Sequence, residues 1–306
     1  MDKQLTNITA DETDAPEPPI SPKRNREEEL LLESATRATE QEVWELAERA
    51  RKRRKHILKK LMSISELSDA TVPFSDTGLS TIADQLRDPA IQTKLPFPSV
   101  WPHLPERFKC TGDDNNWDYT GREKFPTLLK AVQTLESSPE WRGCWLYGTI
   151  GYGKSHLLAA LVCYLIATGR RVVYLPDCRE CTWDPCAYVR AAMLFAWGAP
   201  EDSGIRKRIR ALKTMEAIYE FFEGQQKILF IVDQLNALEL DHSETDQASN
   251  GDKQIIPRWL RKCMAMHRCI FSASANNQTK AWITGKQTGF QQLHVYGGFS
   301  AVSPYS

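Results

Sequence analysis

An eight-residue segment, GTIGYGKS at residues 148–155, constrains the fold of this chain more than any other feature. It fits the pattern G-x-x-x-x-G-K-[ST] in full, and it lies between the apolar run 145–147 and a second apolar run that begins at Leu157. Glycines let the backbone bend and bring its N–H groups close to a phosphate, at the start of a helix whose dipole favours anions. The segment therefore predicts a phosphate-binding loop between a buried strand and a helix.

The positions of this loop have expected roles in nucleotide binding. We expect Lys154 to bridge the β- and γ-phosphates and the Ser155 hydroxyl to ligate Mg²⁺. A glycine-rich turn with a purely structural role is the alternative, and the strand and helix patterns on either side disfavour it. The predicted nucleotide-binding residues of the loop are Gly148, Thr149, Ile150, Gly151, Tyr152, Gly153, Lys154, Ser155 and His156.

A second anchor for Mg²⁺ follows the apolar run 228–232. Asp233 comes directly after that run, and a carboxylate at the end of a buried strand holds the Mg²⁺ shell in proteins with such a loop. Gln234 stands where many ATPases of the additional-strand class carry a glutamate, and a glutamine can orient a water but cannot accept its proton. Asn276 ends the next strand pattern, which we expect to lie beside the strand of Asp233. The predicted catalytic residues are Lys154, Asp233, Gln234 and Asn276, and the predicted Mg²⁺ ligands are Ser155 and Asp233.

Strand and helix patterns alternate from about residue 116 onward. Short runs rich in Val, Ile and Phe predict buried strands, and the stretches between them predict helices. The expected strands cover 143–148, 170–176, 227–233, 269–276 and 293–296, and the expected helices cover 155–168, most of 185–225, and 254–267. The prediction is an α/β fold, a P-loop NTPase of the additional-strand class with a parallel, helix-covered sheet.

The chain divides by composition into four expected parts. Residues 1–33 are polar and charged and predict a disordered tail, and residues 34–70 predict a basic amphipathic helix. Residues 71–115 include a proline-rich stretch and predict a connector. Residues 116–306 are the expected ATPase core, which we expect to be truncated before a lid domain.

Charge and apolar content narrow the possible partners and locations. The 39 basic and 39 acidic side chains cancel, so the net charge indicates neither nucleic acid nor a membrane as partner. No signal peptide or membrane-spanning segment is recognised, because the longest apolar run, 157–167, is too short. Eight scattered cysteines predict reduced thiols in the nucleus or cytoplasm. The basic stretch Arg49–Lys60 leaves two interpretations open, a surface for nucleic acid or an import receptor, or a solvated helix face balanced by glutamates.

The segment YTGREKFPTLLKAV at residues 119–132 resembles the "hhGRE" box that precedes the P-loop in origin-recognition ATPases and in STAND ATPases. That resemblance implies that Tyr119, Thr120, Gly121 and Arg122 line a pocket for the adenine base. An ordinary loop followed by an amphipathic helix is the alternative. With no N-K-x-D guanine motif in the chain, the box favours ATP over GTP.

Three further runs, YGTIGYGKSHLLAALVCYL, ILFIVDQLNALE and FSASANN, resemble the ATPase module of Crinkler-type and retrotransposon hot spot proteins over about residues 117–300. The resemblance implies a nuclear location, in a host cell if the protein is an effector. Such modules typically precede a nuclease-like domain. The sequence stops at Ser306, so we expect a truncated paralogue or an incomplete gene product.

These observations predict an ATP-binding protein with ATP and Mg²⁺ as cofactors. The hypothesis ranked first is an Mg²⁺-dependent ATPase switch. The second is an ATP-binding scaffold without turnover, because Gln234 replaces the usual glutamate. The third is a nuclear protein that binds nucleic acid through the Arg49–Lys60 helix. The sequence leaves the oligomeric state and the protein partner open.

Overall fold

The computed structural model describes residues 22–65, 74–112, 115–148, 151–226, 228–238, 247–274 and 290–294. By its internal contacts the chain divides into two units, Met1–Glu42 and Val43–Ser306. The second unit contains the sheet and the predicted site. Within the described ranges, no helix combines the length and apolar character needed to cross a bilayer.

The centre of the second unit is a five-stranded sheet whose strands are all parallel. Its members are β3 (Gly143–Gly148), β4 (Arg171–Leu175), β5 (Ile228–Val232), β6 (Arg268–Ser274) and β7 (Phe290–His294). The spatial order is β4-β5-β6-β3-β7. Strand β6 therefore separates the strand before the glycine loop from the strand before Asp233, as the additional-strand class requires. The expected fold class is confirmed.

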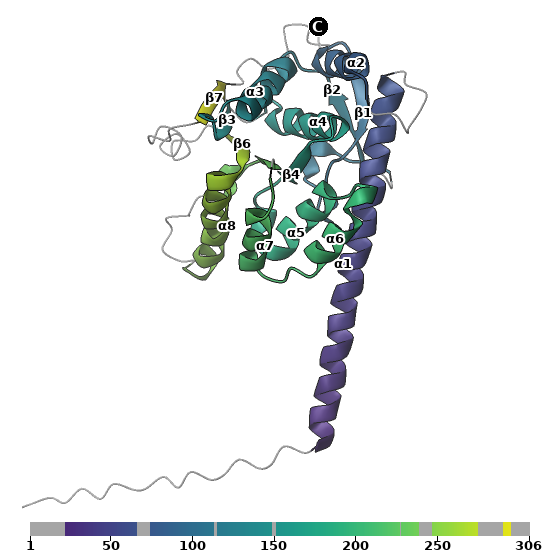
Figure 1. Ribbon diagram of the computed structural model, residues 1–306, viewed down its shortest axis with the longest axis vertical. Helices are drawn as coiled ribbons and strands as arrows, with labels where there is room; N and C mark the ends of the chain where they lie inside the picture. The colour runs from purple at the N-terminus through teal and green to yellow at the C-terminus, as the bar shows by residue number, and fades with distance from the viewer. Residues whose placement is uncertain are drawn as a thin grey trace, which may run out of the picture. The chain divides into compact units, whose positions relative to one another are not determined.

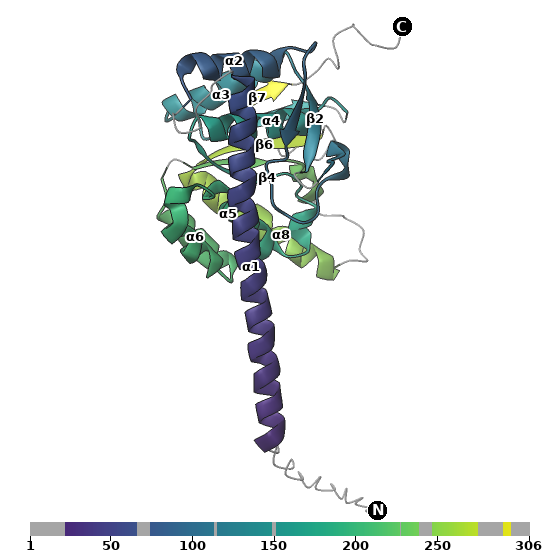
Figure 2. The same ribbon diagram turned by 90° about the vertical axis from the view of Figure 1, so that its right-hand side faces the viewer.

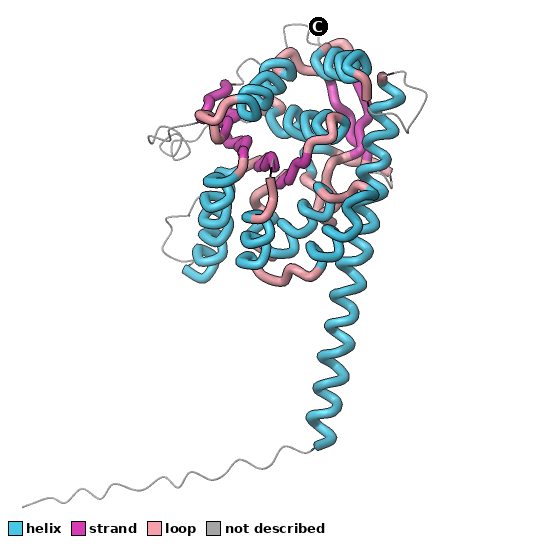
Figure 3. The backbone as a smooth tube through the Cα atoms, viewed as in Figure 1, coloured by secondary structure: helices cyan, strands magenta, loops and turns pink. Residues whose placement is uncertain are grey.

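Helices cover both faces of this sheet (Figure 1). Helices α3 (Phe125–Ser137) and α4 (Lys154–Ala167) lie on one side, and α5 (Pro185–Ala196), α7 (Met215–Glu223) and α8 (Gln247–Met266) lie on the other. Helix α6 (Ser203–Arg210) packs beside α5. The strands form a single row between the two helical layers (Figure 3). Because α4 is buried from Leu157 to Ile166, its sequence is apolar on all sides.

The expected strands and helices of the second unit are present, most of them with ends that differ by one or two residues, and two elements differ by more. Helix α8 begins at Gln247, earlier than the expected start at residue 254. Strand β7 (Phe290–His294) begins earlier than the expected start at residue 293. Four short 3₁₀ helices complete the described part, namely η1 (Glu106–Phe108), η2 (Glu180–Thr182), η3 (Pro200–Asp202) and η4 (Leu235–Leu238).

The expected connector at residues 71–115 contains regular structure that packs on the core. Helix α2 (Asp76–Arg87) buries Ile82 and Leu86, and Ser75 caps it by accepting a hydrogen bond from Gly78 N–H at 3.1 Å. Strand β1 (Gln92–Pro96) pairs in an antiparallel hairpin with β2 (Asn116–Thr120) (Figure 2). A proline is compatible with this strand because the two-stranded sheet has a free edge. The proline content of residues 71–115 therefore gave no indication of helix α2 or strand β1.

Helix α1 spans Pro22–Ile64, so it begins earlier than the expected start at Ser34. Residues 22–33 contain a proline suited to the first helical turn, followed by glutamates and leucines, which are good helix formers. The expected disorder of residues 1–21 lies outside the described residues. From Val43 onward, α1 belongs to the second unit and buries an apolar stripe of Val43, Leu46, Ala47, Ala50, Ile57 and Leu61.

The basic stretch of α1 faces in two directions. The Arg53 guanidinium donates to the Phe97 carbonyl oxygen at 3.2 Å, and Arg54 is buried with its pKa lowered by burial and by the nearby Arg171. Arg49, Lys52, Lys55 and Lys59 are exposed. Two of the arginines in the expected partner surface therefore contribute to the fold, and the surface itself stays a prediction.

Candidate nucleotide-binding site

The glycine loop connects β3 to α4 through backbone that only glycine adopts freely. Gly151 has φ 89° and Gly153 has φ 75°, both in the left-handed region. Gly153 is the N-cap of α4, and Lys154 begins that helix. The first free amides of α4 therefore lie at the loop, where a helix dipole favours a phosphate. Thr149 and Ile150 lie outside the described residues.

Lys154 is held inside the loop rather than on the surface. Its side chain is 7% exposed and its Nζ donates to the Gly148 carbonyl oxygen at 2.6 Å. Burial lowers the pKa of Lys154, and the Asp233 carboxylate opposes this effect. The ammonium group therefore already stands beside the backbone that would surround a phosphate.

Asp233, at the end of β5, is the point where the predicted site residues meet. It is 1% exposed, and burial raises its pKa. The Arg107 charge, side-chain hydrogen bonds with Ser155 and Ser272, and the Gln234 backbone N–H oppose this rise. The Gln234 N–H donates to Asp233 Oδ1 at 2.9 Å. The structure thus brings Ser155 and Asp233, the two predicted Mg²⁺ ligands, close together.

This donor set suits magnesium. A serine hydroxyl and a carboxylate are hard oxygen ligands, which Mg²⁺ prefers, and Mg²⁺ commonly uses one or two carboxylates together with phosphate oxygens. Ser155 and Asp233 would hold the ion between them at the mouth of the glycine loop.

Gln234 has an unusual backbone for a residue with a side chain. Its φ is 58°, in the left-handed region, and its side chain is half-buried. Its carbonyl oxygen accepts a hydrogen bond from Ala237 N–H at 2.9 Å, which begins the turn into η4. Strained backbone of this kind persists where surrounding contacts determine it, and it is concentrated at functional sites.

We expect Gln234→Gly to raise the free energy of unfolding by about 1 kcal/mol, because glycine adopts this conformation without the steric cost that a Cβ adds. Urea denaturation of the two proteins measures the difference. Gln234→Ala is the matched control, since it removes the same side chain but keeps the Cβ. Equal stability of the glycine and alanine variants would contradict the assignment of strain to this position.

The segment around Arg122 lies directly against the glycine loop. A Cβ placed on Gly153 would stand 2.4 Å from the Arg122 guanidinium carbon. Tyr119 is fully buried on β2, and its hydroxyl donates to the Leu86 carbonyl oxygen at 2.9 Å. Arg122 is therefore at the loop, whereas the Tyr119 hydroxyl is already engaged. The expected adenine pocket formed by these residues stays a prediction.

His156 follows Ser155 and belongs to an aromatic cluster. Its ring centroid lies 4.8 Å from that of Phe108 and 5.3 Å from that of Trp117. Burial and the charges of Arg122 and Arg107 lower the pKa of His156 to about 4. The imidazole is therefore neutral near pH 7, and it serves as packing between α4 and the segments that precede β3.

Three residues of the site were not predicted from the sequence. Arg107 pairs with Asp233, its Nη2 standing 3.2 Å from Asp233 Oδ2. Asp177 follows β4 and lies 3.0 Å from Arg107 Nη1, and Ser272 on β6 contacts Asp233. The position of Asp177 just beyond a parallel strand was a usable signal, because the carboxyl ends of parallel strands line ligand sites. Arg107 follows the proline-rich stretch and carries no motif.

Asn276, the expected γ-phosphate residue, lies outside the described residues.

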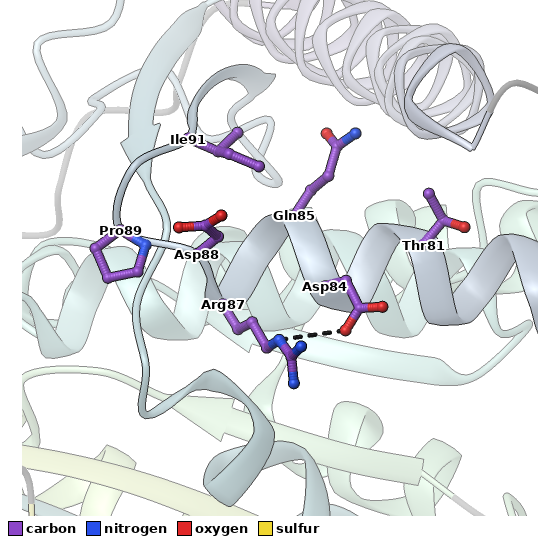
Figure 4. A pocket seen from close by; sticks show the side chains of 7 residues that line it. All are labelled: Thr81, Asp84, Gln85, Arg87, Asp88, Pro89 and Ile91. Carbon is purple, nitrogen blue, oxygen red and sulfur yellow. Dashed lines mark ion pairs between the residues drawn. The ribbon is translucent and has the colours of Figure 1, made fainter.

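A separate surface pocket of about 500 Å³ is lined by Thr81, Asp84, Gln85, Arg87, Asp88, Pro89 and Ile91 (Figure 4). There Arg87 and Asp84 form an ion pair at 3.2 Å, with both side chains 57% exposed. Both charged side chains of this ion pair are therefore largely solvated.

The strand order, the left-handed glycines before α4 and the acidic end of β5 define a class of protein. The chain contains a nucleotide-binding P-loop NTPase domain. The NACHT domain matches residues 142–300, which is just over half of the chain. The chain belongs to this family of STAND P-loop NTPases.

Among solved structures, a DNA replication initiation factor is similar to this chain, with 14% sequence identity and a TM-score of 0.35. The alignment covers 56% of this chain and 45% of that one, so it spans less than half of the initiation factor. The chain matches none of the curated proteins compared with it.

Proposed function

We propose that this chain is an ATP-binding protein that hydrolyses ATP in the presence of Mg²⁺ and acts as a nucleotide-dependent switch. The observation that carries the proposal is the proximity of Ser155, in the first turn of α4, to the buried Asp233 at the end of β5, where the serine hydroxyl is close enough to lower the pKa of the carboxyl group. Lys154 stands beside them in the loop. These three side chains supply the cation contact and the metal ligands that phosphoryl transfer needs.

Each group has a role in this proposal. The amides of the loop and the Lys154 ammonium bind the β- and γ-phosphates. Ser155 and Asp233 hold Mg²⁺, which neutralises charge on the phosphate oxygens when it is bound. Gln234 orients the attacking water, and Asn276 is the residue proposed to contact the γ-phosphate. Because Gln234 cannot take the proton of that water, the hydrolysis we propose is slow.

The preference for ATP rests on the segment around Arg122. Arg122 lies against Gly153, so the turn that follows β2 borders the loop. Tyr119 and Arg122 are the residues proposed to border the base.

We also propose that the chain is of the Crinkler type and is located in the nucleus. Both proposals depend on the residues around the nucleotide-binding motifs. The exposed Arg49, Lys52, Lys55 and Lys59 of α1 would suit an acidic partner there.

We expect Gln234→Glu to raise the rate of phosphate release about tenfold or more while leaving ATP affinity nearly unchanged. Glutamate has the same size as glutamine, and its carboxylate can accept the proton of the attacking water, a contribution of roughly 10²–10⁴-fold in general base catalysis. Single-turnover hydrolysis by the parent and the variant measures the change.

Gln234→Ala is the companion variant, and it should hydrolyse ATP more slowly than the parent because it cannot orient water. If the parent protein releases no phosphate but Gln234→Glu does, the result would favour the ATP-binding scaffold without turnover. A parent and a glutamate variant that both bind ATP but release no phosphate would refute the proposed hydrolysis.

A further inference from the structure

Arg107 joins two buried carboxylates at the carboxyl edge of the sheet. Its Nη2 lies 3.2 Å from Asp233 Oδ2, and its Nη1 lies 3.0 Å from Asp177 Oδ2. The two carboxylate side chains are 1% and 3% exposed, and the arginine is 21% exposed. Its Nη2 also donates to the Pro176 carbonyl oxygen at 2.5 Å. The Arg107 guanidinium thus forms ion pairs with two buried carboxylates, each of which follows a strand of the sheet.

The segment that carries Arg107 is fixed by its own packing. Arg107 is in η1, and the next residue, Phe108, is buried against Phe97, Trp117 and His156. Phe97 and Phe108 have ring centroids 4.5 Å apart. Since His156 follows Ser155 on α4, the arginine and the predicted metal ligands are parts of one packed group.

Asp233 is also the carboxylate proposed to hold Mg²⁺. An arginine within hydrogen-bonding distance of that carboxylate and a divalent cation bound by the same group repel one another, and burial strengthens the repulsion. Asp177 can keep its own contact with Arg107 when Asp233 turns to a metal, because Arg107 Nη1 and Nη2 contact the two carboxylates separately. The arrangement permits exchange of partners without release of the arginine.

We propose that Arg107 competes with Mg²⁺ for Asp233, so that this arginine sets the Mg²⁺ concentration at which the site takes up ATP. The inference rests on the proposed function, because it requires ATP and Mg²⁺ to bind at the glycine loop. Asp177 is the tether in this exchange. It accepts hydrogen bonds from Arg179, at 2.6 Å, as well as from Arg107, so its charge stays compensated throughout.

The test is a titration of Mg²⁺ at a fixed concentration of a fluorescent ATP analogue, at pH 8, with the full chain and Arg107→Gln. We expect the Mg²⁺ concentration for half-maximal binding to fall about tenfold or more in the variant, since the charge-assisted hydrogen bond from Arg107 no longer competes with the metal for Asp233. Arg171→Gln is the matched control. Arg171 lies away from the loop, where its Nη1 is 3.0 Å from Oδ2 of the buried Asp202. Loss of this ion pair should leave the Mg²⁺ midpoint unchanged.

Two outcomes would overturn the inference while leaving the proposed function intact. One is an Mg²⁺ midpoint that is the same in the parent and Arg107→Gln. The other is a loss of ATP affinity relative to ADP affinity without a lower midpoint, which would place Arg107 on the γ-phosphate. A parent that binds no ATP at any Mg²⁺ concentration would overturn both.

Thermal unfolding without nucleotide shows whether Arg107→Gln is folded. If it is not, Arg107→Lys takes its place, because lysine keeps the charge but cannot contact both carboxylates with a planar fork. We expect its Mg²⁺ midpoint to fall by a smaller factor than for glutamine, and an unchanged or raised midpoint in the folded lysine variant would refute the competition.

Discussion

Replacing Lys154 with alanine should weaken ATP binding about a hundredfold, the largest effect that we expect from any single change in the site. The Lys154 Nζ already lies 2.6 Å from the Gly148 carbonyl oxygen, beside the loop that would surround the phosphates. Loss of a charge-assisted contact with phosphate costs about 3 kcal/mol, which corresponds to roughly a hundredfold in affinity. Equilibrium binding of a fluorescent ATP analogue in the presence of Mg²⁺ measures it.

Lys130→Ala is the control for this variant. Lys130 is exposed on α3. Its replacement removes the same charge from the protein without changing the loop. It should bind ATP with the affinity of the parent. Unchanged affinity in folded Lys154→Ala would mean that nucleotide is bound elsewhere, and the assignment of the glycine loop would fail.

Replacing Gly121 with alanine should lower the free energy of unfolding by about 3 kcal/mol or more. A Cβ on Gly121 would stand 2.0 Å from the Asp88 carbonyl oxygen and 2.5 Å from its carbonyl carbon. Asp88 is the C-cap of α2, and Figure 4 shows it just beyond that helix. Backbone cannot yield as a flexible side chain can, so the turn that carries Arg122 must move away from α2. Chemical denaturation measures this loss.

Gly204→Ala is the matched control for that variant. Gly204 lies in α6, and a Cβ there would meet nothing within 4 Å. The same substitution should therefore stabilise the protein by about 0.5–1 kcal/mol, because alanine favours a helix. If Gly121→Ala were as stable as the parent, the close approach of this turn to α2 would be refuted.

The sheet could be predicted because its strands are short, buried and apolar. Strand β3 matches its expected bounds, and β4, β5 and β6 differ from theirs at the ends. The contact between Ser155 and Asp233 could also be predicted, because the motif fixes one residue and the strand end fixes the other. Local pattern and tertiary position agree in this part of the chain.

Arg107 could not be predicted, because its role depends on contacts that are distant in sequence. It reaches Asp177 and Asp233 only when the segment after β1 folds back over the carboxyl edge of the sheet. Nothing in the residues around Arg107 indicates this path. The same reason explains the connector, where Leu95 and Trp117 become buried by pairing with one another across the hairpin.

The segment around Tyr119 shows a second limit. The motif predicts that residues 119–122 line a base pocket, and the structure places Arg122 against Gly153. It does not predict how each side chain is used, because the Tyr119 hydroxyl contacts Leu86 in the neighbouring segment.

We propose that the glycine loop binds ATP with Mg²⁺ and that the chain hydrolyses it. The most direct measurement is phosphate release from ATP by the purified full chain, with and without Mg²⁺, beside Lys154→Ala. We expect slow release of phosphate that requires both Mg²⁺ and Lys154. Phosphate release that is the same in the parent and in Lys154→Ala, or no release from a parent that binds Mg²⁺ and ATP, would contradict it.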